Sequence, residues 1–167
     1  MRLSEAKGMD IKMNCKTEIF PLAFGTGRLP EMELHKKKIP DQDAIDQMIQ
    51  YAADNGVNYF DTAPLYCSSQ CEQAVGKAVH SFRDSIYLGG KLSAEDMKAD
   101  RCCQALMTTL KNLQTDYLDY YLLWGINQYF FDEVILKKKV LEQMQIFQQE
   151  GLIPVSYTHL RAHETSA

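Results

Sequence analysis

Three ionisable side chains stand where short apolar runs end, and they are the candidates for chemistry. Asp61 closes one run, Tyr66 follows it in the next loop, and Lys91 closes a later run. A carboxylate, a phenol and an ammonium can hold and transfer a proton when they lie at one edge of a sheet. Each has a plain structural alternative, because an Asp can begin a turn, a loop Tyr can be half-buried and a Lys can be solvated.

The elements that would position these side chains alternate between strand and helix. Short apolar runs predict strands, and apolar residues that recur on one face predict helices. The expected strands are Ile19–Gly25, Val57–Phe60, Ile86–Leu88 and Tyr117–Leu123. The expected helices are Asp41–Asn55, Cys71–Phe82, Ala99–Leu113 and Lys139–Glu150. Four such repeats predict an α/β protein built on a parallel sheet.

The pattern alone leaves two parallel folds open. A (β/α)8 barrel carries its active site at the C-terminal ends of the strands, where the ionisable residues recur. A flavodoxin-like open sheet would want a phosphate-binding Gly-rich loop after its first strand. The segment Gly25-Thr26-Gly27 lacks the third glycine of G-x-G-x-x-G, so the signal for that loop is weak.

Long segments of the chain resemble the aldo-keto reductase family. The segments are residues 23–30, residues 56–63 with Tyr66, Glu72 and residues 75–78 after them, and residues 110–123. The sequence of these segments is most similar to the bacterial branch of the family that often carries a C-terminal ferredoxin-like iron–sulfur module. The resemblance runs from about Ile19 to Ile153. It implies an incomplete (β/α)8 TIM barrel, of which this chain holds roughly the first four β/α units.

The resemblance also implies hydride transfer between NADPH and a carbonyl compound by an Asp-Tyr-Lys-His tetrad. Asp61, Tyr66 and Lys91 match the first three positions. A reduced carbonyl becomes an alkoxide that needs a proton, a nearby ammonium stabilises the phenolate left behind, and the carboxylate partners the ammonium. We therefore expect the Tyr66 hydroxyl within direct or one-water hydrogen-bond reach of Lys91, with Asp61 beside Lys91.

The fourth position departs from the family pattern, because Trp124 stands where the family has His. Indole Nε1–H only donates and does not titrate, so Trp124 can orient a carbonyl but cannot relay a proton. Its bulk would also crowd a substrate pocket. The functions that remain are an NADP-dependent oxidoreductase and a non-catalytic relative that binds nucleotide or a partner protein. A third alternative is an aldolase or isomerase that forms a Schiff base on Lys91. It does not explain the long segments that resemble the aldo-keto reductase family.

The resemblance implies that the loop Gly25, Thr26 and Arg28, together with Asp61, contacts NADP. In this family most contacts to the cofactor phosphates come from later strands. Four strands are too few to close a barrel, which typically takes about 250 residues. We therefore expect this chain alone to be inactive, with an unpaired edge on its fourth strand and an exposed apolar face. The expected partner is a small-molecule carbonyl substrate.

Composition narrows the classes of partner. A net charge of −4 and a pI of about 5.5 disfavour nucleic acids and anionic membranes. Five cysteines in an odd, irregular set, after an N-terminus without an export signal, predict reduced thiols in a cytoplasmic protein. Cys67 and Cys71 have no third or fourth metal ligand nearby in the sequence, so we expect no metal site at these cysteines. Any 4Fe-4S cluster would belong to a missing C-terminal part. The lysine runs Lys36–Lys38 and Lys137–Lys139 are expected to be solvated.

The last residues carry a separate prediction. Val155–Thr165 back-translates to a string that resembles a transposon-end sequencing adapter read in frame, and Pro154 fits the codon before it. We therefore assign residues 1–153 to the barrel fragment and residues 154–167 to a non-native, adapter-derived tail. A natural polar C-terminal tail is the alternative.

Overall fold

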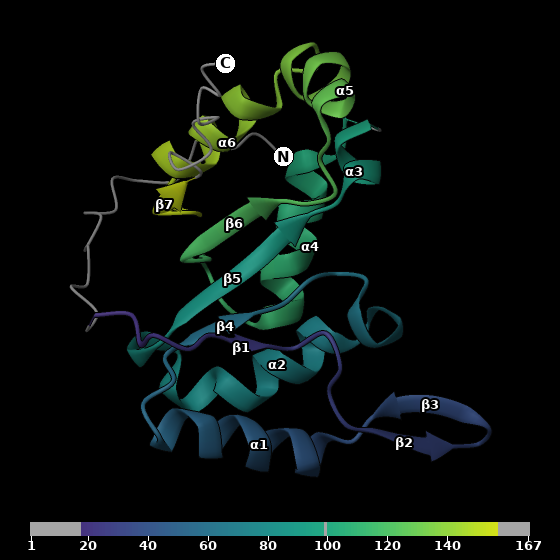
Figure 1. Cartoon of the computed structure of the whole chain (residues 1–167), viewed down its shortest axis with the longest axis vertical. Helices are drawn as coiled ribbons and strands as arrows, with labels where there is room; N and C mark the ends of the chain where they lie inside the picture. Colours follow the sequence, from purple (N-terminus) through teal and green to yellow (C-terminus); the bar gives the residue numbers. More distant parts are fainter. Residues whose placement is uncertain (1–17, 99, 157–167) are drawn as a thin grey trace, which may run out of the picture.

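The computed structural model describes residues 18–98 and 100–156 as a curved parallel sheet with helices packed along one side (Figure 1). The strands are β1 (Phe24–Gly25), β4 (Tyr59–Asp61), β5 (Tyr87–Leu92), β6 (Tyr120–Leu123) and β7 (Val155–Ser156). They lie in the order β1-β4-β5-β6-β7, and every neighbouring pair is parallel. This is the arrangement of a partial TIM barrel, as the family resemblance implied.

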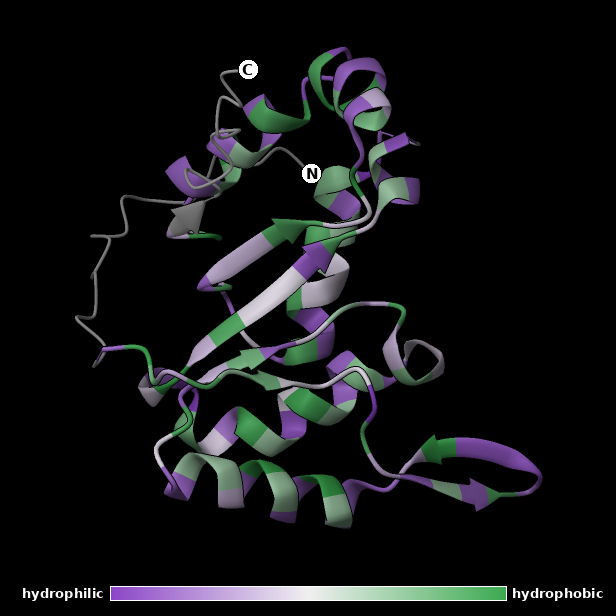
Figure 2. Cartoon of the chain, in the orientation of Figure 1, coloured by the Kyte–Doolittle hydropathy of each residue, from purple (hydrophilic) through white to green (hydrophobic). Residues whose placement is uncertain are grey.

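Helices connect the strands and pack against one another in chain order. They are α1 (Gln42–Asp54), α2 (Cys71–Val79), α3 (Ala94–Lys98), α4 (Cys102–Leu113), α5 (Gln128–Phe130) and α6 (Val140–Gln149), with short turns η1 (Tyr66–Ser69) and η2 (His80–Ser85) and the π-helical η3 (Phe131–Leu136). The Asp41 side chain caps α1 by accepting from the Ala44 amide at 3.2 Å. Hydrophobic and hydrophilic residues alternate around α1 and α2, as expected of helices with one buried face (Figure 2). No helix in the described ranges is long and apolar enough to cross a bilayer.

The two sides of the sheet differ in character, because alternate strand residues face opposite ways. Phe60, Leu88, Leu92 and Tyr121 are buried on the helix side. On the other side the rings of Tyr59 and Tyr120 meet at 5.3 Å between centroids, and Tyr87 lies 6.1 Å from Tyr120. Asp61 and Lys91 stand an even number of positions after Tyr59 and Tyr87, so they share this side. In a closed barrel this side is the interior.

Several predicted boundaries are wrong. The first strand contributes only Phe24–Gly25 to the ladder, and Leu22 before it is 63% exposed. The third strand continues through its glycines to Leu92. The predicted helix Ala99–Leu113 instead begins at Cys102, after Asp100 adopts a φ of 55° that interrupts helical geometry.

The predicted unpaired edge on the fourth strand is also wrong. β6 pairs with β7, so that Tyr120 lies opposite Val155 and Tyr121 opposite Ser156. The edge of the sheet is therefore the two-residue β7. Residues 157–167, where most of the predicted adapter-derived tail falls, lie outside the described residues, and that assignment stays a prediction.

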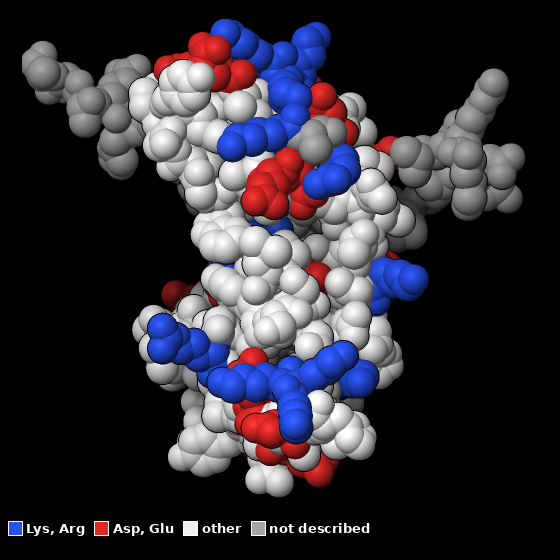
Figure 3. Space-filling view, turned by 90° about the vertical axis from the view of Figure 1, so that its right-hand side faces the viewer, with Lys and Arg blue, Asp and Glu red and all other residues white. Residues whose placement is uncertain are grey.

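An antiparallel hairpin that is absent from the predicted elements projects from the sheet between β1 and α1 (Figure 1). Its strands are β2 (Glu31–Leu34) and β3 (Lys37–Pro40), joined by His35 and Lys36 with φ of 50° and 63°. Viewed from that side, Lys and Arg side chains form a band across the lower half of the molecule, at the height of the hairpin (Figure 3). The lysine run Lys36–Lys38, in the turn and second strand of this hairpin, is exposed, as predicted.

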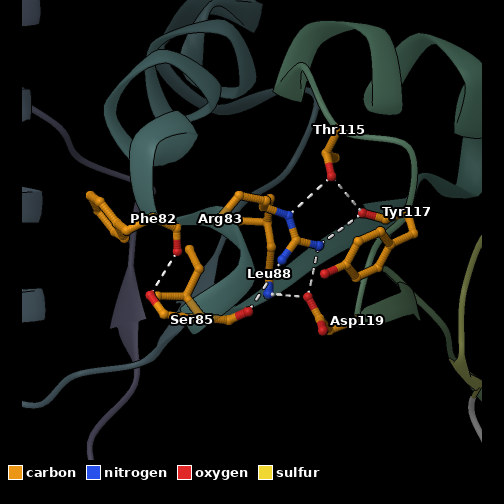
Figure 4. Close-up of polar contacts among 8 residues, drawn as sticks. Phe82, Arg83, Ser85, Leu88, Thr115, Tyr117 and Asp119 are labelled. Carbon is orange, nitrogen blue, oxygen red and sulfur yellow. Dashed lines mark hydrogen bonds and ion pairs between the residues drawn. The ribbon is translucent and has the colours of Figure 1, made fainter. Parts of the chain in front are cut away.

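A buried ion pair holds the N-terminal ends of β5 and β6 together (Figure 4). The Arg83 guanidinium lies 2.8 Å from the Asp119 carboxylate, and both residues are less than 10% exposed. The same guanidinium donates to the Thr115 hydroxyl at 3.0 Å and to the carbonyls of Ile86 and Tyr117 at 3.2 and 2.9 Å. This cluster sits at the end of the sheet opposite to Lys91, so it supports the fold rather than the candidate chemistry.

Candidate active site

Lys91 and Asp61 form an ion pair at the C-terminal edge of the sheet. Asp61 is the last residue of β4 and lies opposite Gly89, two residues before Lys91 on β5. The Lys91 ammonium donates to the Asp61 carboxylate and, at 3.0 Å, to the carbonyl of Thr62. Lys91 is 9% exposed, so its charge is held by these two acceptors rather than by water.

Tyr66 lies against this ion pair. The Lys91 ammonium is 5.1 Å from the centroid of the Tyr66 ring, and the ring of Trp124 meets Tyr66 edge-on, with centroids 6.1 Å apart and planes at 74°. Trp124 directly follows β6 and its amide donates to the Leu92 carbonyl, which fixes it at the same edge. No hydrogen bond joins the Tyr66 hydroxyl to Lys91 in the described part of the chain. The structure thus brings the four predicted catalytic positions to one edge of the sheet. The Lys91 ammonium lies over the ring of Tyr66 rather than beside its hydroxyl.

The loop after β1 completes the site. Gly27 passes so close to Tyr66 that a Cβ built on it would lie 3.6 Å from the Tyr66 ring. Thr26 is fully buried, and its amide and hydroxyl both donate to the Asp61 carbonyl, at 2.9 and 2.8 Å. The side chain of Thr26 therefore braces the loop, whereas Gly25 and Arg28 are exposed. A Cβ at Gly25 would meet no atom within 4 Å, so open space lies beside this part of the loop.

Cys71 connects the loops of the site, and the sequence analysis missed this role. Its buried thiol donates to the Thr26 carbonyl at 3.2 Å and lies 3.2 Å from the Thr26 hydroxyl and 3.4 Å from the Thr62 hydroxyl. Burial raises the pKa of the Cys71 thiol to about 11. The thiol partners stand on other loops, so no local sequence signal announces them.

A second buried acid, Glu72, joins α2 to α4 next to the site. Its carboxylate accepts from the Thr109 hydroxyl at 2.8 Å and from the Asn112 amide at 2.9 Å, and burial raises its pKa above the usual range. Glu72 and Lys91 both line a cavity of about 350 Å³ between the Tyr66 loop and α4. Glu72 therefore fixes the helix whose first turn follows Tyr66.

Tyr59 stands beside Asp61 on the tyrosine side of the sheet. A Cβ built at Gly89 would lie 2.6 Å from the Tyr59 hydroxyl, so that hydroxyl occupies space that only a glycine leaves free, whereas the 3.5 Å to Asp61 Oδ1 would be an ordinary contact. Burial, reinforced by the neighbouring Asp61 charge, raises the pKa of Tyr59 to about 12. Its phenol is therefore neutral at ordinary pH. Among the described residues no group of three or more His, Cys, Asp or Glu could hold a metal ion.

Comparison with known proteins agrees with this architecture. The chain matches the model of the Aldo/keto reductase family over residues 21–155. It is 29% identical over 109 residues to a methylglyoxal reductase of Escherichia coli, covering 64% of this chain and 37% of that protein. It is 38% identical over 77 residues to an NADPH-dependent codeinone reductase of Papaver somniferum, covering 43% of this chain and 24% of that protein.

Solved structures give the same result. An aldo-keto reductase from Klebsiella pneumoniae in complex with NADPH superposes with a TM-score of 0.66 at 27% identity, covering 80% of this chain and 43% of that one. The chain therefore spans less than half the length of each of these relatives. Because the family match covers most of its residues and the partial barrel agrees with it, this chain belongs to the Aldo/keto reductase family.

Proposed function

We propose that this chain carries the proton-donating part of an NADP-dependent reductase of carbonyl compounds, and that the chain by itself is inactive. The observation that supports this most is the Lys91–Asp61 ion pair lying against the ring of Tyr66. The relatives named as methylglyoxal and codeinone reductases support a small carbonyl substrate, and the NADPH complex of the Klebsiella protein supports the cofactor.

Each residue has a role that follows from its contacts. Tyr66 would give its proton to the carbonyl oxygen, and the positive charge of Lys91 stabilises the phenolate left behind. Asp61 and the Thr62 carbonyl hold the ammonium in place and offset the cost of its burial. Trp124, edge-on to Tyr66, would donate a hydrogen bond to the substrate oxygen but cannot relay a proton.

The described residues fit one end of the cofactor only. Open space beside Gly25, the partly exposed carboxylate of Asp61 and the exposed guanidinium of Arg28 suit a nicotinamide riboside, which supplies the hydride when bound. A dinucleotide also carries a pyrophosphate and a 2′-phosphate, and a single guanidinium is too little to hold these charges. This is the reason for proposing that residues 1–153 alone neither bind NADPH tightly nor turn over. An iron–sulfur module of the kind that the resembled bacterial branch often carries would lie in a further C-terminal segment.

The test uses the 167-residue chain and a chimera that continues residue 153 with the C-terminal half of the Klebsiella reductase. The chain alone should show no micromolar NADPH binding and no aldehyde-dependent loss of NADPH absorbance. The chimera should bind NADPH and reduce an aldehyde weakly, with activity lost in Tyr66→Phe and Lys91→Met and increased in Trp124→His. Turnover by the chain alone, lost in Tyr66→Phe, would contradict the proposed inactivity.

A non-catalytic relative remains the second candidate, and Trp124 is the observation that favours it. In that case the chimera would bind NADPH without reducing any aldehyde, and Trp124→His would not restore activity. Retention of Asp61, Tyr66 and Lys91, with the Lys91 ammonium paired to Asp61 and lying over the Tyr66 ring, favours the enzyme, because a pure binding module does not require the set.

A further inference from the structure

We propose that the cavity between the Tyr66 loop and α4 is a binding site for a short-chain primary amine, whose ammonium group pairs with the carboxylate of Glu72. The cavity measures about 350 Å³. This volume lies at the lower end of small-molecule sites, which are about 300–1,000 Å³. The proposed reductase chemistry assigns no role to the cavity, so the inference does not depend on the proposed function.

The lining of the cavity combines polar and apolar side chains. Residues from the start and one side of α4 recur at intervals of three or four positions, which places them on a single face of the helix. They are Arg101, Gln104, Ala105, Thr108, Thr109 and Asn112. The remaining lining residues are Pro64, Leu65, Ser69, Glu72, Lys91 and Asp96. A ligand that suits this lining has a charged or polar group and a short apolar part.

Among the described lining residues, Glu72 carries a charge that no opposite charge offsets. The Lys91 ammonium pairs with Asp61, and the Arg101 guanidinium lies 3.1 Å from the Asp96 carboxylate. Glu72 is only 2% exposed, and its recorded partners in the described part of the chain are a hydroxyl and an amide rather than a cation. Buried charges in proteins are normally paired. The cavity is therefore acidic at Glu72 and balanced elsewhere.

A second buried polar group lies beside Glu72. The Glu72 carboxylate accepts from the Thr109 hydroxyl at 2.8 Å. A Cβ built at Gly90 would lie 3.3 Å from the Thr109 methyl group and 3.4 Å from a ring carbon of Tyr121, so the Tyr121 ring stands next to Thr109. Tyr121 is 1% exposed, and within the described residues its hydroxyl has no hydrogen-bond partner. Burial and then the charge of Glu72 raise the pKa of Tyr121, in agreement with this placement.

A primary ammonium group meets the needs of both side chains. It supplies the positive charge that Glu72 lacks, and its three N–H groups can donate to the carboxylate and to the oxygen of Tyr121. Hydrogen bonds between ionised groups are roughly twice as strong as neutral ones. An anion would instead meet an uncompensated like charge at Glu72. The alkyl chain of the amine has apolar lining to pack against, at Pro64, Leu65 and Ala105.

The experiment measures urea unfolding of the purified 167-residue chain in the presence of n-butylammonium chloride, with ionic strength matched by sodium chloride. A ligand that binds only the folded state stabilises it. We expect the urea midpoint to rise with butylammonium concentration and to reach a plateau. Tetramethylammonium, a cation without N–H groups, and 1-butanol, a chain without charge, should give no such plateau.

Variants and NMR locate the site. Glu72→Gln should weaken butylammonium binding by at least about tenfold, because it removes a charge-assisted hydrogen bond. The control Glu95→Gln, which removes an exposed carboxylate on α3, should bind like the parent chain. Tyr121→Phe should bind more weakly than the parent and provides a second variant if Glu72→Gln does not fold. The Asn112 side-chain amide, which donates to Glu72, should shift in NMR spectra as the amine saturates.

The proposal would be overturned by any of three results. Tetramethylammonium could raise the urea midpoint as much as butylammonium, which would show general attraction of cations to a chain of net charge −4. Glu72→Gln and Tyr121→Phe could both bind butylammonium as tightly as the parent. The NMR shifts could also fall away from the cavity, for example at Asp46 and Asp54 on α1, and leave the Asn112 amide unchanged.

Discussion

Replacing Arg83 by Met should destabilise the chain more than any other single loss of charge among its described ion pairs. The guanidinium makes three hydrogen bonds to Thr115, Ile86 and Tyr117 and an ion pair at 2.8 Å with Asp119. The substitution keeps a side chain of similar length but removes the cation beside the buried Asp119 carboxylate, which keeps the Leu88 amide as a donor at 2.9 Å. Removing one partner of a buried pair typically costs about 3–5 kcal/mol.

That cost is a large part of the stability that the chain can have. Whole domains are stable by about 5–15 kcal/mol, and a partial barrel belongs at the low end of that range. Arg83→Met should therefore keep only about 0–2 kcal/mol of stability at 25 °C. Arg83→Lys should be intermediate, because it keeps the charge but loses the fork that reaches several acceptors at once.

The assay is urea unfolding followed by far-UV circular dichroism and by the emission of Trp124. The matched control is Arg101→Met, whose ion pair with Asp96 spans 3.1 Å between side chains that are 54% and 27% exposed. An exposed pair of this kind contributes at most about 1 kcal/mol. If Arg83→Met lost no more stability than Arg101→Met, the view that this buried cluster holds β5 to β6 would be refuted.

Three further predictions concern packing and titration. Gly76→Ala should destabilise the chain by about 1–3 kcal/mol in urea unfolding, because its Cβ would lie 2.6 Å from the backbone of Leu113 at the end of α4. The control Gly25→Ala should be near neutral, because its Cβ would meet no atom within 4 Å. Equal losses of stability in the two variants would contradict this prediction. Glu72→Gln should gain stability relative to the parent chain as pH rises from about 4.5 to 7. Burial raises the pKa of the Glu72 carboxyl in the folded state, so the folded parent holds this proton more tightly than the unfolded chain and loses stability as the carboxyl ionises. A pH-independent difference in urea midpoint between the two proteins would refute this assignment. Gly89→Ala should displace the Tyr59 hydroxyl and lower the pKa of Tyr59 from about 12, which NMR titration of ring-labelled tyrosine measures; an unchanged value would show that the contact is absent.

The placement of the candidate site was predictable because it depends on strand ends. Asp61 and Lys91 close runs whose pattern identifies parallel strands, and parallel strands bring their C-terminal ends to one edge. Trp124 follows a third run and reaches the same edge. Predicting where these three residues lie requires only the order of the strands and helices, which the periodicity of apolar residues reveals. It does not require the exact ends of any element.

The parts that the sequence did not predict depend on contacts between distant residues or on unusual backbone geometry. The hairpin was missed because its turn uses His35 and Lys36 at positive φ, where Asn and Gly are the usual signal. β5 was predicted too short because two glycines weaken a strand pattern, yet pairing on both sides keeps them in the sheet. The buried thiol of Cys71 acts on loops far from it in sequence, which no local pattern reveals.

The strand order has a consequence for how the chain forms during synthesis. Because β1, β4, β5, β6 and β7 are neighbours in the order in which the ribosome delivers them, each new strand can add to an edge that already exists. Every pairing in the sheet then spans a single connection between strands that follow one another in the sheet, which keeps the loop-closure entropy of each step small. The sheet can therefore grow from its N-terminal end as the nascent chain emerges. At every stage the growing edge is the surface that a chaperone, or a second nascent chain, would contact first.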